Sequence, residues 1–362
     1  MNDTPVESAA RPERMLTFRG GGWVILMSVV TFVIVGLVTV PPLLRNSMNR
    51  PQGDGTNPAS YGFALEPLLV PAAQLLPKSH HRDIIEPLTN PVTMAGSDVV
   101  TWNAENRGKF LVTNDRVLGV VVGGEARAYP LGPLSAHETI NDTVGGVPIA
   151  VHFNPLCRTY VAFERTIGGS VREFSATGLV HQGCHLIYIR GEHGDPEVTG
   201  ESLWHPLQLR AVSGPMAEAE VTLEALPCQL MHWQDWLALH PETTVIAPPA
   251  KDDKETKERW QEMSYEPYYL QEMMIAPIEP MPEDPVAAKA QWIAIRHDGA
   301  WCGWSFEEVI GAVDAEGAWP VTCGDTEYVL HFRPDPAVVW VESADALPVV
   351  KYCAEFAWQI RQ

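Results

Sequence analysis

Residues 137–165 hold the densest group of side chains that could carry out chemistry. A His-Glu pair and an Asn-Asp pair lie just before a Gly-Gly turn, and a single thiol, Cys157, follows the next predicted strand. A carboxylate beside a histidine orients the imidazole and fixes its tautomer. An arginine next to the thiol can lower the thiol pKa or bind a carboxylate. The residues expected to bind a ligand here are His137, Glu138, Asn141, Asp142, Cys157 and Arg158.

A second group of donors lies on the predicted loop 177–185, between two further strands. Its imidazoles and its thiol are side chains that bind copper or zinc. The spacing matches no established metal motif, so the pattern leaves open whether a metal is bound. If copper or zinc is present, the expected ligands are His137, Cys157, His181, Cys184 and His185.

Short strands are the elements that must position these residues. The chain contains 31 prolines and 28 glycines and only 19% charged residues, which indicates a turn-rich, β-rich protein. Residues 147–153 form a predicted strand after the Gly145-Gly146 turn. Residues 117–122 and 126–129 form a predicted hairpin. The expected fold class is therefore α+β, mainly β.

A repeated pattern suggests that the chain contains a duplication. Residues 147–164 read VPIAVHFNPLCRTYVAFE and residues 326–342 read TEYVLHFRPDPAVVWVE, so both contain His-Phe-x-Pro. A hairpin precedes each segment and a tryptophan-containing helical segment follows each one. We expect two related β-rich subdomains in which His152 and His331 occupy equivalent positions. The second copy lacks the His-Glu pair and the thiol, so chemistry is expected in the first.

The N-terminal part of the chain has the composition of a membrane anchor. Residues 23–40 are 18 consecutive residues without a charge. At about 1.5 Å per residue, such a helix approaches the roughly 30 Å of a bilayer core. A cleaved signal peptide is the alternative, but the run is long for one and no small-x-small cleavage site follows it. We expect residues 45–362 on the extracytoplasmic, periplasmic side of the cell membrane.

The predicted organisation of the chain has six parts. They are an N-terminal tail (1–22), a transmembrane anchor (23–44), a tether and wrapping segment (45–86), a first β-rich unit (87–249), a linker (250–288) and a second, degenerate β-rich unit (289–362). The six cysteines permit disulfides but do not require them. The net charge of -20 repels polyanions and excludes nucleic acid as a partner.

Several of these segments resemble the bacterial domain-of-unknown-function family 3179 (DUF3179). The resemblance runs from about Pro87 to the C-terminus and includes His-Glu-x-x-Asn-Asp at 137–142, Ser-Leu-Trp at 202–204 and Trp-x-x-Trp at 233–236. The resemblance supports the domain limits given above. It implies no particular activity, because the family has no settled one. The usual Cys-Pro-Leu-Cys motif of the family has Asn154 in its first position here. A two-thiol mechanism at this motif is therefore not expected.

Three functions fit the sequence. The broken thiol motif favours a membrane-anchored extracytoplasmic accessory or binding subunit, whose partners are the membrane, through residues 23–44, and other membrane-protein subunits. The second is an extracytoplasmic metal-binding (copper or zinc) or redox protein that uses His137 and Cys157. The third is a Cys-His hydrolase with Cys157 as nucleophile and His137 as base.

Overall fold

The computed structural model describes residues 24, 26–35, 53–106, 109–191, 201–250, 252–262, 264–342 and 347–358. The chain forms two compact units, residues 1–51 and residues 52–362. In the first unit, residues 24 and 26–35 are helical. No helix among the described residues is both long enough and apolar enough to span a bilayer. The remainder of the predicted 23–44 anchor, including residues 36–44, lies outside the described residues.

The second unit is mainly β-sheet, as predicted, and its elements occur in two parallel series. Each series is a β-hairpin, a short helix, a three-stranded antiparallel meander, one further strand and a final helix. The first copy consists of β4 (Arg116–Val122), β5 (Glu125–Pro130), α3 (Leu131–His137), β6 (Thr139–Val144), β7 (Val147–Asn154), β8 (Thr159–Glu164), β16 (Cys228–His232) and α5 (Trp233–Leu239). The second copy consists of β18 (Gln291–His297), β19 (Ala300–Ser305), α8 (Phe306–Ala312), β20 (Ala318–Cys323), β21 (Thr326–Arg333), β22 (Val338–Glu342), β23 (Val350–Ala354) and α9 (Glu355–Trp358).

The strand register of the two meanders is the same. His152, in the middle strand β7, lies opposite Thr139 and Val161. His331, in the middle strand β21, lies opposite Ala318 and Trp340 at the same separations in sequence. Equivalent register is what a duplication predicts, because a slip of one residue would place the side chains on the opposite face.

The two copies are not separate subdomains, because each completes the other. Strand β23 of the second copy pairs with β8 of the first at Tyr352 and Tyr160. Strand β16 of the first copy is tied to β22 of the second, since the Gln229 side chain donates to the Val341 carbonyl at 2.9 Å and accepts from the Val341 N–H at 3.1 Å. One hydrophobic core contains residues of both copies. The predicted boundary at residues 250–288 therefore does not separate two compact units.

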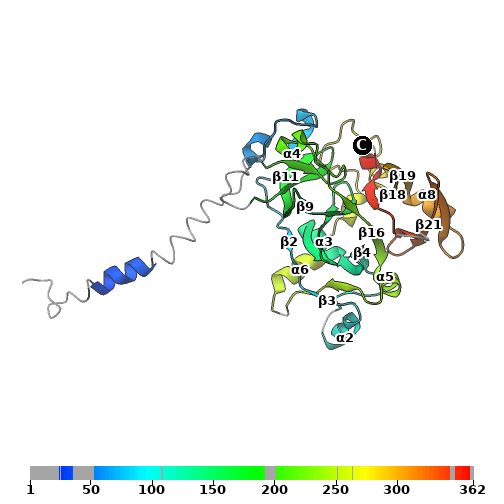
Figure 1. The fold of residues 1–362 in the computed structure, drawn as a ribbon, viewed down its shortest axis with the longest axis horizontal. Coiled ribbons are helices and arrows are strands. Elements are labelled where there is room, and N and C mark those ends of the chain that lie inside the picture. Colours follow the sequence, from blue (N-terminus) through cyan, green and yellow to red (C-terminus); the bar gives the residue numbers. More distant parts are fainter. Residues whose placement is uncertain are drawn as a thin grey trace, which may run out of the picture. The chain divides into compact units, whose positions relative to one another are not determined.

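A large insertion distinguishes the first copy from the second. Residues between β8 and β16 form β9 (Thr166–Ile167), β10 (Ser170–Val171), β11 (Phe174–His181), β12 (Cys184–Ile189), β13 (Leu203–His205), β14 (Arg210–Ala211), α4 (Gly214–Glu218) and β15 (Ala225–Leu226). Strands β11 to β14 and β1 (Leu75–Pro77) make a separate five-stranded sheet. The second copy has only a short connection between β22 and β23 at this point. Figure 1 shows α8 and β21 of the second copy at one side of the body, next to β18 and β19.

The remaining elements surround the two copies. Strand β2 (Leu88–Thr89) extends the eight-stranded sheet beside β6, and β17 (Thr244–Ile246) joins β3 (Thr93–Ala95) to the β4–β5 hairpin. The helices on the outside are η2 (Pro58–Tyr61), η3 (Ala72–Gln74), α2 (Asp98–Glu105), α6 (Lys254–Glu262), α7 (Glu266–Tyr269) and η4 (Ala287–Lys289). The tryptophan-containing helical segment expected after the first repeat begins only at Trp233, because residues 228–232 pair with β4.

Two glycine turns fix the hairpins that carry the candidate site. Gly145 and Gly146 adopt φ values of 56° and 77°, which suit the two-residue turn between β6 and β7. A Cβ on Gly145 would lie 2.2 Å from the Val122 carbonyl oxygen, so the turn packs against the neighbouring β4–β5 turn without room for a side chain. The predicted 147–153 strand is confirmed as β7.

The link between the copies can be tested at Gln229, which is buried. Replacing it with Met (Gln229→Met) removes both hydrogen bonds to Val341 and leaves the buried Val341 N–H and carbonyl without these partners. The free energy of unfolding should therefore fall by about 1–3 kcal/mol. Chemical denaturation measures this. The matched control is Gln234→Met, because Gln234 is exposed. Equal stability of the two variants would contradict the proposed link.

Candidate functional site

All four polar residues of the His-Glu-x-x-Asn-Asp motif have protein partners, and those of His137 and Asp142 tie four elements together. His137 Nδ1 lies 2.8 Å from the Glu86 carbonyl oxygen, to which it donates, and His137 Nε2 accepts from the Trp260 indole N–H at 3.1 Å. Asp142 accepts from Tyr129 and from Arg127, both at 2.8 Å. These contacts join α3, β5, β6 and α6, and they give His137 and Asp142 a structural role.

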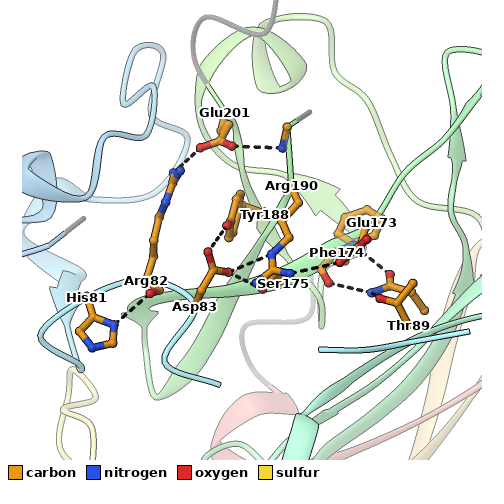
Figure 2. A network of polar contacts seen from close by, with 12 residues as sticks. His81, Arg82, Asp83, Thr89, Glu173, Phe174, Ser175, Tyr188, Arg190 and Glu201 are labelled. Carbon is orange, nitrogen blue, oxygen red and sulfur yellow. Dashed lines mark hydrogen bonds and ion pairs between the residues drawn. The ribbon is translucent and has the colours of Figure 1, made fainter. Parts of the chain in front are cut away.

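Asn141 fastens the insertion to the meander of the first copy. Its side-chain amide donates to the Phe174 carbonyl at 3.0 Å and accepts from the Phe174 N–H at 2.9 Å. Figure 2 shows that a wider polar network continues from this contact across β11 and β12. In it, Asp83 accepts from Ser175 at 2.5 Å and from Tyr188 at 2.6 Å. The network holds the segment before β2 against the insertion sheet.

Glu138 is the member of the motif that keeps an unpaired polar atom. Its side chain is buried, and Oε2 lies 3.0 Å from Nδ1 of His185, while Oε1 has no hydrogen-bond partner in the described part of the chain. Its backbone has φ 54° and ψ -32°, outside the regions that non-glycine residues usually occupy. Strain of this kind persists where the surrounding structure imposes it, and it is frequent at functional sites.

A group of buried polar residues surrounds Glu138 where β7 meets the insertion sheet. We call it the buried histidine cluster; its buried members are Glu138, His152, Asn154, His181 and His205, and the partly buried His185 completes it. The rings of His181 and His205 have centroids 5.5 Å apart. Asn154 donates to the His185 carbonyl at 2.9 Å, and His152 Nδ1 lies 3.0 Å from Thr139 Oγ1.

The cluster contains buried polar atoms without partners. Both ring nitrogens of His181 and of His205, together with His152 Nε2, Glu138 Oε1 and Asn154 Oδ1, have no hydrogen bond within the described residues. Burial lowers the pKa of His152 to about 3 and that of His181 to about 4. The pKa of His205 lies well below its ordinary value because of burial and because a positive charge there would be repelled by His181. All three imidazoles are therefore neutral at physiological pH.

The structure brings together only part of the predicted metal-ligand set. His181, Cys184 and His185 lie at the turn between β11 and β12, and Cys184 contacts Cys157. His137 is not part of this group: the fold-back at Gly145 and Gly146 brings the backbone of Glu138 to β7, whereas the His137 ring contacts Glu86 and Trp260. The contacts of the His137 ring among the described residues do not include Cys157, and that the two share one site stays a prediction.

Among the residues that the structure describes, donor atoms of three metal-binding side chains lie within 4.8 Å of one another at His297, Asp298 and Asp325. That group is on the surface of the second copy. The predicted ligands do not form such a group. Arg158, predicted to bind a ligand, instead places its guanidinium over the Tyr269 ring at 4.2 Å.

Sequence reasoning missed His205 and gave His152 only the role of a repeat marker. His152 and Asn154 are polar residues near the end of the apolar strand β7, and both are buried. Two buried polar positions in such a strand are a signal that could have identified them. His205 carried no such signal, because it follows Leu203 and Trp204 in a short strand far along the insertion.

His137 also positions one wall of a surface cleft. A cleft of about 790 Å³ is lined by residues that include Trp102, Phe110, Arg116 and Trp260. This volume lies in the range of small-molecule sites, which is roughly 300–1,000 Å³. The indole N–H of Trp260 donates to His137. His137, which the sequence suggested as a catalytic base, therefore fixes the position of a residue that lines the cleft.

The neutral histidines predict a specific dependence of stability on pH. His152 has a folded pKa of about 3, below its ordinary value of 6.5, so its contribution to stability is present above pH 6.5 and is lost as pH falls towards 3. Unfolding free energy should fall by about 1.4 kcal/mol per pH unit for this histidine. Denaturation in EDTA between pH 6.5 and 4 should show a smaller slope for His152→Gln than for the wild type. Identical slopes would show that His152 is not a buried neutral group.

Comparison with known proteins identifies the family. The family model described as "Protein of unknown function (DUF3179)" matches residues 90–347, which include the first copy, the second copy from β18 to β22 and the whole histidine cluster. Searches of curated proteins and of solved structures found no match to the chain. Because the matched residues make up most of the chain, the protein belongs to the DUF3179 family.

Proposed function

We propose that this DUF3179 protein is a membrane-anchored extracytoplasmic protein that binds a divalent transition-metal ion, zinc or copper, in the buried histidine cluster. The observation that carries the proposal is the set of five buried ring nitrogens of His152, His181 and His205 without partners. Buried polar atoms almost always have partners, so an exception indicates a bound ion or an ordered water. A neutral imidazole is the form in which histidine binds metal.

The composition of the cluster fits zinc or copper better than magnesium or calcium. Imidazole is a ligand that both zinc and copper prefer, whereas magnesium and calcium select oxygen atoms. The contact between Glu138 and His185 resembles the carboxylate–histidine pairs that orient metal-binding imidazoles. Glu138 also supplies a negative charge that offsets part of the charge of a bound cation.

Binding requires rotation of the imidazoles, because the donor atoms do not lie within 4.8 Å of one another as a set of three. The rings of His181 and His205 have no hydrogen bonds to other described residues that rotation would break. The energetic cost of rearranging them is therefore small compared with that of a fully bonded histidine.

The geometry gives little support to a Cys-His hydrolase. A nucleophilic cysteine needs a base within hydrogen-bond reach. Among the described contacts, the Cys157 thiol lies 3.2 Å from the Thr159 hydroxyl and contacts Cys184, while both nitrogens of His137 already have partners. We therefore do not propose hydrolysis.

Elemental analysis tests the metal site. Full-length protein purified in detergent and loaded with Zn²⁺ should retain zinc after gel filtration, and His181→Ala combined with His205→Ala should lose it. His331→Ala and His137→Ala should retain it, because His331 occupies the equivalent position of the second copy and His137 lies outside the cluster. Circular dichroism checks that each variant is folded. Zinc retention by the folded double variant, or its loss from His137→Ala, would contradict the proposal.

The cysteines support an extracytoplasmic location. Cys302 and Cys323 form a disulfide between β19 and β20, with Cα atoms 5.7 Å apart. Disulfides of this kind persist in oxidising compartments such as the periplasm and are rare in the cytosol. The uncharged run at residues 23–40 is the feature that favours membrane attachment.

Membrane attachment is tested by cell fractionation. The full-length protein should remain with membranes after carbonate extraction, since an apolar anchor is not released by high pH, and deletion of residues 1–45 should release a soluble protein. Immunoblotting and N-terminal sequencing provide the measurement. A soluble full-length product whose N-terminus lies near residue 42 would instead indicate a cleaved signal peptide.

A second candidate function, that of an accessory or binding subunit, is favoured by the cleft beside α2 and α6. Its lining combines the aromatic residues Trp102, Phe110 and Trp260 with the basic residues Lys109 and Lys257. Such a mixture of apolar walls and a few polar groups is typical of binding sites. Membrane subunits that co-purify with the wild type and are lost from Trp260→Ala would support this function, whereas co-purification independent of Trp260 would not.

A further inference from the structure

Two buried thiols from different elements meet beside the histidine cluster. Cys157 lies in the turn between β7 and β8, and Cys184 is the first residue of β12. Both side chains are fully buried within one apolar cluster, and the neighbouring Cys157 adds to the effect of burial in raising the pKa of the Cys184 thiol. The fold therefore assembles a thiol pair that the local motif lacks, since Asn154 replaces the nearby cysteine of the family pattern.

The surroundings of the thiol pair contribute a further soft donor. Cys157 and Cys184 belong to one apolar cluster, against which the partly buried side chain of Met274 packs. Thiolate and thioether groups are the ligands that select monovalent copper over the harder divalent metals. Histidine nitrogens, by contrast, dominate the adjacent cluster, so the two groups differ in the metal that they favour.

A buried lysine packs against Tyr268, a residue that lies near both thiols. Lys289 is 1% exposed, and its ammonium donates to the carbonyls of Tyr268 at 2.8 Å and Met273 at 3.1 Å, and to that of Gln271. The same ammonium lies 4.3 Å from the centre of the Tyr268 ring. Burial is the main cause that raises the pKa of Tyr268 to about 12, and the nearby Cys157 and Cys184 contribute to the shift. No carboxylate forms a salt bridge with Lys289 within the described part of the chain, so its charge is free to compensate an anion at the thiols.

We propose that Cys157 and Cys184 form a second metal site, which binds Cu(I) as a bis-thiolate. One Cu⁺ ion replaces the two thiol protons, which pass to solvent, and two Cu–S bonds form without any change of oxidation state. The resulting complex carries one negative charge. The ammonium of Lys289 offsets this charge in a region that excludes water, and Met274 is placed to approach the ion. The site does not depend on metal binding at the histidines.

Another cysteine provides a matched control. Cys228 is also buried and reduced, but it lies in β16 and its thiol donates to the Val350 carbonyl at 3.4 Å. It tests whether a buried thiol alone is sufficient for copper uptake. The Cys302–Cys323 disulfide serves as an internal standard for the oxidised state.

The experiment titrates the full-length protein in detergent, without oxygen, with Cu(I) in competition with bicinchoninate. The wild type and Cys228→Ser should each remove one equivalent of copper, and Cys157→Ser and Cys184→Ser should remove none. Lys289→Met should bind about 10–100-fold more weakly, because it removes the compensating charge. Zn²⁺ loading of the same variants is measured in parallel, and its retention by the serine variants separates this site from the histidine cluster and shows that the variants are folded.

Three results would overturn the proposal. Equal copper uptake by the wild type and by both folded serine variants would place the ion elsewhere. Uptake lost equally from Cys228→Ser would show that the effect is not specific to the pair. The third result comes from peptide mapping of the isolated protein without reduction. If a Cys157–Cys184 disulfide is recovered together with Cys302–Cys323, the pair is a structural disulfide.

Discussion

Pairing between the two copies is the constraint on which the rest of the structure depends. The meander of the first copy is extended by β23 of the second, and the Gln229 side chain of the first copy bonds the main chain of Val341 in the second. The hydroxyl of Tyr352 reinforces the second junction by accepting from the Leu230 N–H and donating to the Val339 carbonyl, both at 2.9 Å. Neither copy can complete its sheet alone, so both contribute to one core.

This pairing also explains why only one copy holds the candidate site. The two meanders share a register, but the insertion between β8 and β16 is fastened to the meander of the first through Asn141. Its contacts with the second copy include the bond from Lys351 of β23 to the Leu207 carbonyl. His152 is consequently buried between two sheets, whereas its counterpart His331 is partly exposed and bonds Glu342 at 2.8 Å. The same strand position thus produces a neutral buried imidazole in one copy and a surface ion-pair partner in the other.

The energetics of burial favour a ligand in the histidine cluster. An unpartnered buried polar group costs about 1–3 kcal/mol, and the cluster contains several such groups on His152, His181 and His205. A protein has a total stability of only about 5–15 kcal/mol, so the combined cost is a large part of it. Bound metal or ordered water would remove this cost. In the two proposals together, the thiol pair and the histidines are adjacent sites whose ligand atoms, sulfur in one and nitrogen in the other, favour different metals.

The sequence predicted the features that depend on local patterns. The Gly145-Gly146 turn, strand β7 and the mainly β fold class follow from turn chemistry and β-propensity, and the structure confirms them. The shared element order and register follow from the repeated His-Phe-x-Pro pattern. The cleft wall at Trp260 was not predicted, because the helix that carries it was interpreted only as part of the linker at residues 250–288.

The composition of the site could be predicted only in part, because it depends on contacts between distant segments. Sequence reasoning identified Glu138, Cys157 and Cys184 but grouped them with His137, whose ring contacts Glu86 and Trp260 instead. The direction of a side chain at the end of a helix follows from tertiary packing and not from sequence spacing. His205 comes from the insertion, and only the pairing of β12, β13 and β14 brings it to His181.

The most direct test of the account is anomalous diffraction from crystals of the protein grown with zinc, recorded on both sides of the zinc absorption edge. The account predicts an anomalous peak bonded to His181 and His205, with Glu138 beside it. Ordered water at these nitrogens in zinc-soaked crystals, or a peak confined to the surface group of His297, Asp298 and Asp325, would contradict the central claim that the histidine cluster is a metal site.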